Sequence, residues 1–101
     1  MQFSHSTTPT GCIVALTDSF TFNDHHAFRA LLDTIKTSKG HQHVLDLSGL
    51  EFVDSAALGM LLIANDEARN SGCSLILRHP PERIARLIQL AAMDTIFSIE
   101  P

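Results

Sequence analysis

An aspartate–serine pair at the start of a predicted helix offers the most specific chemistry in the chain. Asp54 and Ser55 precede a run of small and apolar residues at helical spacing. The Asp54 carboxylate is suited to cap that helix, because its oxygens can accept the free N–H groups of the first turn. Those groups and the positive end of the helix would also tolerate a phosphate on Ser55, which adds a charge of roughly −1.5 to −2. The pair therefore predicts a phosphoacceptor serine, although Asp-Ser is also common as a plain helix cap.

The helix that begins at Ser55 is predicted to carry a binding surface. At about 100° per residue, its sheet-facing side holds small and apolar residues. These are Ala57, Leu61, Ala64 and Ala68. Gly59 and Leu62 fall on the side of Ser55, and Met60 lies toward a flank. A small apolar patch beside a serine suits a docking surface that a charge can switch off. Packing within the domain would explain the same residues, so both interpretations stay open.

Other reactive residues do not form a catalytic or metal-binding pattern. The six histidines include no HExxH motif and no Cys/His cluster, and we expect most of them on the surface. Cys12 and Cys73 lie in or beside strand-like runs, and we expect both to be small buried residues. Ser55 is not in a GxSxG nucleophile elbow, and no glycine-rich phosphate loop is present. We therefore expect no enzyme activity and no cofactor.

Hydrophobic patterning predicts an α/β fold around this pair. Strand-like runs are 2–6, 12–16, 43–47 and 73–77, with a last short strand or turn at 94–99. Helices are expected after Asn23 and Asp24 and up to Gly40, over 55–70, and after Pro80-Pro81-Glu82, with 48–54 as a loop. Ile84, Leu87, Ile88 and Ala91 should line the buried face of the last helix. This order predicts one mixed β-sheet with helices packed on it, as a single domain over 1–101.

Composition narrows the class of protein. The chain has 101 residues, 45% hydrophobic residues and a formal net charge of −4. A mildly acidic chain argues against a nucleic-acid-binding protein, which usually carries a basic stripe. No apolar stretch reaches the ~18 residues of a membrane span, and the N-terminus does not resemble a signal peptide. We therefore expect a cytoplasmic protein with no membrane insertion.

The segment from Leu47 to Gly59, LSGLEFVDSAALG, resembles the signature of STAS domains, including bacterial anti-sigma factor antagonists. The resemblance extends over nearly the whole chain and implies a single STAS domain, 1–101. It implies that Ser55 is the phosphorylation site and that Asp54 shapes its loop. Many members carry Gly and Asp in the turn before the first helix, and Asp18 and Thr21 are the matching positions here. Small residues follow the serine, and here they are Ala56 and Ala57.

The resemblance also implies a role in bacterial partner switching and transcription regulation. The unmodified domain would bind an anti-sigma factor that is also its serine kinase, and a serine phosphatase would reverse the mark. The expected partner-binding residues are Asp54, Ala56, Gly59, Met60, Leu62 and Thr21. The alternative is a STAS subunit that stays docked on the cytoplasmic ATPase of a lipid-trafficking ABC transporter, with Ser55 never modified.

Overall fold

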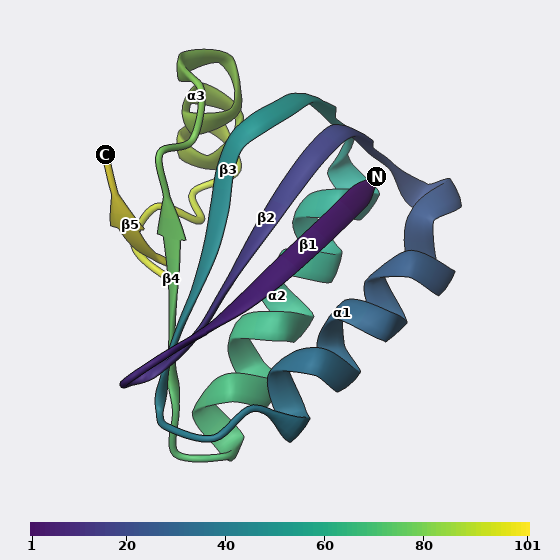
Figure 1. Ribbon diagram of the computed structural model, residues 1–101. Helices are drawn as coiled ribbons and strands as arrows, with labels where there is room; N and C mark the ends of the chain where they lie inside the picture. Colours follow the sequence, from purple (N-terminus) through teal and green to yellow (C-terminus); the bar gives the residue numbers. More distant parts are fainter.

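The computed structural model describes residues 1–101 as a sheet with helices packed on it (Figure 1). The strands are β1 (Gln2–Thr8), β2 (Gly11–Phe20), β3 (Gln42–Val53), β4 (Ser74–Arg78) and β5 (Ser98–Glu100). The helices are α1 (His25–Thr37), α2 (Ser55–Asn70) and α3 (Glu82–Leu90), and a short 3-10 helix, η1 (Phe22–Asp24), precedes α1. The predicted α/β class with a mixed sheet is confirmed.

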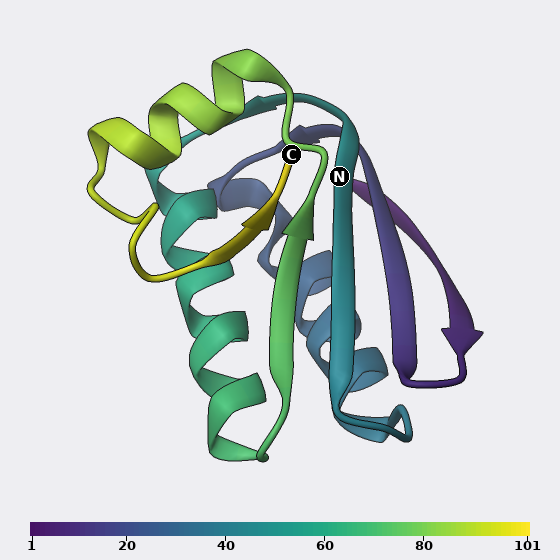
Figure 2. The same cartoon turned by 90° about the vertical axis from the view of Figure 1, so that its left-hand side faces the viewer.

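The five-stranded sheet has the order β1-β2-β3-β4-β5. Strand β1 pairs antiparallel with β2, and all later neighbours pair parallel. Helices α1 and α2 lie side by side on one face, whereas α3 lies beyond the arrowhead of β4 (Figures 1 and 2). The connection from β2 to α1 and the connection from β3 to α2 therefore meet at one end of the sheet. None of the helices combines the length and apolar character of a membrane span.

The end of β3 and the end of α1 differ from the sequence prediction. Residues 48–53, expected as a loop, continue β3, because Leu50 and Val53 enter the core and pair with the end of β2. Irregularities in that pairing accommodate the Ser48-Gly49 sequence, which by itself indicated a turn. Helix α1 ends at Thr37, and Gly40 lies in the following loop with φ 95° rather than directly after the helix.

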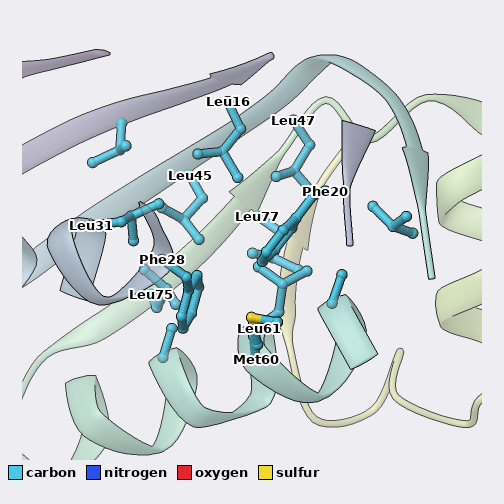
Figure 3. Close-up of a cluster of buried hydrophobic side chains, with 14 of the residues drawn as sticks. Leu16, Phe20, Phe28, Leu31, Leu45, Leu47, Met60, Leu61, Leu75 and Leu77 are labelled. Atoms are coloured by element: carbon cyan, nitrogen blue, oxygen red, sulfur yellow. The ribbon is translucent and has the colours of Figure 1, made fainter. Parts of the chain in front are cut away.

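The core lies between the sheet and helices α1 and α2 (Figure 3). Alternate residues of β2 point into it, while the helices contribute residues at spacings of three and four. Phe20 of β2 stacks on Phe28 of α1, with ring centroids 5.5 Å apart. The four residues predicted for the sheet-facing side of α2 are all buried: Ala57, Leu61, Ala64 and Ala68. On α3, Ile84 and Ile88 are buried as predicted, whereas Leu87 is half-buried and Ala91 is exposed.

His43 is the exception among the six histidines, since the other five are exposed, which confirms the expectation for most of them. Its side chain is buried in β3, and its Nδ1 atom lies 3.4 Å from the Sγ atom of Cys12 on β2. Burial, together with the nearby His41, lowers the pKa of His43, so the ring is favoured in its neutral form. Cys12 is buried as expected, whereas Cys73 is only partly buried.

Candidate functional site

Ser55 is exposed at the first residue of α2. The helix starts there because Asp54 is extended and acts as its N-cap. Behind the serine, Ala57 and Leu61 anchor the helix in the core, which fixes the direction in which its first turn points. The hydroxyl group therefore lies at a rigid helix terminus, where N–H groups and the helix dipole favour negative charge.

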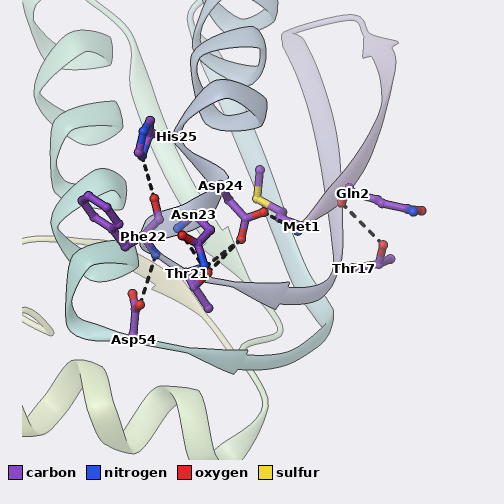
Figure 4. A network of polar contacts seen from close by, with 9 residues as sticks. All are labelled: Met1, Gln2, Thr17, Thr21, Phe22, Asn23, Asp24, His25 and Asp54. Atoms are coloured by element: carbon purple, nitrogen blue, oxygen red, sulfur yellow. Dashed lines mark hydrogen bonds and ion pairs between the residues drawn. The ribbon is translucent and has the colours of Figure 1, made fainter.

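The Asp54 carboxylate joins two segments that are far apart in the sequence. Its Oδ1 atom accepts a hydrogen bond of 2.8 Å from the N–H of Ala57, and thereby caps α2. Its Oδ2 atom accepts one of 3.1 Å from the N–H of Phe22, in η1 (Figure 4). The backbone N–H of Asp54 also donates to the carbonyl of Phe20 at 3.4 Å. Asp54 thus holds the start of η1 against the start of α2.

Thr21 and Asp24 shape the neighbouring η1 segment through a reciprocal cap. The Thr21 hydroxyl accepts from the N–H of Asn23 at 3.3 Å, and Asp24 Oδ2 accepts from the N–H of Thr21 at 2.8 Å. Asp24 Oδ1 also pairs with the α-amino group of Met1 at 2.7 Å (Figure 4). Partial burial opposes ionisation of Asp24, but these hydrogen bonds outweigh it and lower its pKa. The Thr21 hydroxyl is therefore engaged in holding the turn beside Asp54.

Two exposed phenylalanines lie in the chain segments that meet at Asp54, and sequence reasoning did not include them in the site. Phe22 is 61% exposed and Phe52 is 48% exposed. The Phe22 ring contacts His25 edge-on, with centroids 5.0 Å apart, and its backbone is fixed by Asp54. Exposed aromatic rings on a fixed backbone are typical anchors of protein interfaces. In the sequence, the one indication of such a ring was Phe52, an apolar residue in the segment 48–54 that was expected to be a loop.

Along α2, the exposed side continues from Ser55 through Gly59 to Ile63, each four residues after the last. A Cβ atom at Gly59 would meet no atom within 4 Å, so this side of the helix faces open space. Ile63 is 52% exposed. Ala56, in the first turn, is partly exposed. We name the set Phe22, Ser55, Ala56, Gly59 and Ile63 the Ser55 surface; Phe52, which alternates with the buried Val53 along β3, is directed to the other face of the sheet.

Two predicted partner-binding residues lie elsewhere. Met60 is only 9% exposed and belongs to the core cluster, so its assignment to the docking surface is corrected. Met60 lies two turns before Glu67, which pairs with Lys36 of α1 at 3.5 Å, so Met60 is on the side of α2 that packs near α1. The helical pattern of α2 alone does not show which element covers that side. Leu62 is half-buried and packs against the core, so only part of its side chain can reach a partner.

Asp18 occupies a position before the first helix at which the family resemblance leads us to expect glycine. It lies at an irregularity of the β2–β3 pairing and adopts a left-handed backbone with φ 66°. Glycine favours this region, and aspartate is among the few other residues that tolerate it. Asp18 thus adopts a backbone conformation that glycine favours.

Comparison with known proteins identifies the family. A family model described as "Mlab, STAS domain" matches residues 3–100. The chain belongs to the STAS domain family. A STAS-domain containing protein of Pseudomonas aeruginosa (strain UCBPP-PA14) is 26% identical over 80 residues, which cover 79% of this chain and 78% of that protein.

Solved structures share the fold of this STAS domain. A candidate anti-sigma factor antagonist from Thermotoga maritima superposes with a TM-score of 0.82 and 23% identity, over 98% of this chain and 86% of that one. The unphosphorylated form of the anti-sigma factor antagonist SpoIIAA gives 0.76 and 19%, over 99% and 89%. The phosphorylated form of SpoIIAA, a Bacillus cell fate determinant, gives 0.71 and 16%, over 99% and 92%.

The bonds of Asp54 predict that this residue stabilises the STAS domain. Asp54→Ala removes the cap of α2 and leaves the Phe22 N–H without its acceptor, so we expect unfolding free energy to fall by about 1–2 kcal/mol. Urea denaturation measures this loss. Asp66→Ala is the matched control, because Asp66 is exposed on the same helix, and it should change stability by less than about 0.5 kcal/mol. Equal stability of the two variants would contradict a structural role for Asp54.

Proposed function

We propose that this STAS domain is a protein-binding module, without enzyme activity of its own, that acts as an anti-sigma factor antagonist in bacterial partner switching. The observation that carries the proposal is the exposed Ser55 hydroxyl at the start of α2, next to Asp54, which holds the backbone of the exposed Phe22. In the unmodified state the Ser55 surface binds the partner, an anti-sigma factor with serine kinase activity. Phosphorylation of Ser55 releases the partner, and a serine phosphatase restores the binding state.

The chemistry of the site supports this order of events. A phosphate on Ser55 would lie beside the Asp54 carboxylate and next to apolar side chains. Both Asp54 oxygens already accept backbone N–H groups, so this negative charge is fixed in place. A partner that buries Phe22 together with the start of α2 would have to desolvate the added charge, which disfavours the complex. The names of the structural relatives, two of them anti-sigma factor antagonists and one a phosphorylated form, agree with such a role.

Intact-mass analysis of the protein purified from its native cytoplasm tests the proposal. We expect a fraction of the molecules to carry one phosphoryl group, located on Ser55 by peptide fragmentation. Ser55→Ala should abolish the added mass. Ser71→Ala should not, since Ser71 is an exposed serine at the other end of the same helix.

Two results would count against the proposal. A phosphoryl group located on another residue would remove Ser55 from the switch. Protein that is never modified and always co-purifies with a transporter ATPase would instead support the alternative of a fixed transporter subunit.

A further inference from the structure

Strand β1 forms an open edge of the sheet (Figure 2). It is a strand of 7 residues, whereas β5 at the opposite edge has 3. Proteins usually protect such an edge with lysine, proline, a bulge or a covering element. The sequence of β1, QFSHSTT, contains no charged residue apart from a titratable histidine and no proline, and its pairing with β2 has no irregularity. The edge is therefore free to pair with another strand.

The hairpin geometry determines which backbone groups point outward. Thr8 faces Gly11 across a two-residue turn, and such a closing pair is directed inward, with hydrogen bonding between the strands. Two side-chain contacts agree with this direction. Gly11 N–H donates to Thr8 Oγ1, and the Thr17 hydroxyl donates to the carbonyl of Gln2. Since the direction alternates along an antiparallel strand, the N–H and C=O groups of Phe3, His5 and Thr7 point away from the sheet.

We propose that a second copy of this chain pairs with this edge, β1 against β1, antiparallel about a two-fold axis at His5. In this register His5 faces His5 of the second copy, and Phe3 faces Thr7 on both sides of the axis. Every outward N–H and C=O group then has a partner. A register centred on Ser6 would place Phe3 opposite Pro9, which has no N–H. A register centred on Ser4 would involve Met1, whose amino group is bound by Asp24.

Self-complementarity favours a second copy over an unrelated strand. The same residues on both sides satisfy each other, as a two-fold interface requires. The chain carries a net charge of −4, which disfavours contact between copies in general, but β1 contains none of its acidic residues. Pairing would join the two sheets edge to edge, with the helices of both copies on one face.

The consequence for the molecule is a dimer with two separate Ser55 surfaces. The Ser55 surface lies at the end of the sheet where β2 and β3 end, and antiparallel pairing places the two copies' surfaces at opposite ends. The pairing involves no residue of the Ser55 surface. It can therefore exist whether or not Ser55 is phosphorylated.

Disulfide trapping tests the register. In a Cys73→Ser background, His5→Cys should form a disulfide-linked dimer under mild oxidation, because hydrogen-bonded antiparallel neighbours have Cα atoms about 5.5 Å apart. Thr7→Cys is the matched control on the same side of the same strand. Its counterpart would lie about 14 Å away along the pair, so cross-linking should be at least about tenfold slower. The remaining cysteine, Cys12, is buried.

Sedimentation equilibrium provides an independent test with the unmodified chain. The wild type should associate to a dimer in a concentration-dependent way. His5→Lys should return it to monomer, because two lysines would face each other, whereas Ser4→Lys should not, because Ser4 faces Ser6 of the second copy. Thermal melting confirms that both variants are folded. A strictly monomeric wild type, or equal trapping of the two cysteine variants, would overturn the proposal.

Discussion

Ser55→Asp is expected to weaken binding of the partner by about 10- to 100-fold, equivalent to about 1.4–2.7 kcal/mol of binding free energy. The substitution places a permanent negative charge next to Asp54, which holds the segment of the exposed Phe22, where a partner must exclude water. The exposed position of Ser55 means that the fold should tolerate this change. Titration calorimetry with the protein that co-purifies with the unmodified chain measures the effect.

Two control variants distinguish the effect of a charge at Ser55 from the effect of the change in net charge alone. Ser55→Ala should bind about as tightly as the wild type, since it adds no charge and removes only a hydroxyl group. Ser71→Asp makes the same charge change at the far end of α2 and should leave affinity within about twofold. If Ser71→Asp weakened binding as much as Ser55→Asp, net charge rather than the Ser55 surface would control the partner.

Met60→Ala is expected to lower the free energy of unfolding by about 2–4 kcal/mol, because it removes a buried side chain and leaves a cavity in the core. Ile63→Ala, three residues further along the same helix, should change it by less than about 0.5 kcal/mol, because Ile63 is 52% exposed. Urea denaturation of both variants measures the difference.

The same two variants should behave in the opposite way in partner binding. Ile63→Ala removes apolar area from the Ser55 surface and should weaken the complex, whereas folded Met60→Ala should bind normally. A Met60→Ala variant that is as stable as the wild type and fails to bind would show that Met60 belongs to the binding surface and not to the core.

The fold was predicted well where the hydrophobic periodicity agrees with the residues that begin and end helices and strands. Helix α2 begins at Ser55 and ends at Asn70 as predicted, because a capping aspartate stands before it and Ser71-Gly72 follows it. The extension of β3 could not be predicted in the same way. Residues 48–53 become strand only because β2 lies alongside, and pairing between distant segments outweighs the local turn tendency of Ser48-Gly49.

The candidate site was predicted in part for the same reason. The placement of Asp54 and Ser55 follows from local chain chemistry, since both belong to one helix start. The contribution of Phe22 does not, because it depends on a hydrogen bond across 32 positions of the chain. The position of Met60 also depends on tertiary packing. A helical wheel gives the direction of a side chain, but not which element covers it.

The two hydrogen bonds that join Asp54 to Phe20 and Phe22 have a mechanical consequence. A ligand that displaces η1 must also displace the start of α2 or break the hydrogen bond between them. The two segments would therefore move together. A ligand that binds only the Phe22 ring would thereby also act on the start of α2, where Ser55 lies, without contacting Ser55 itself.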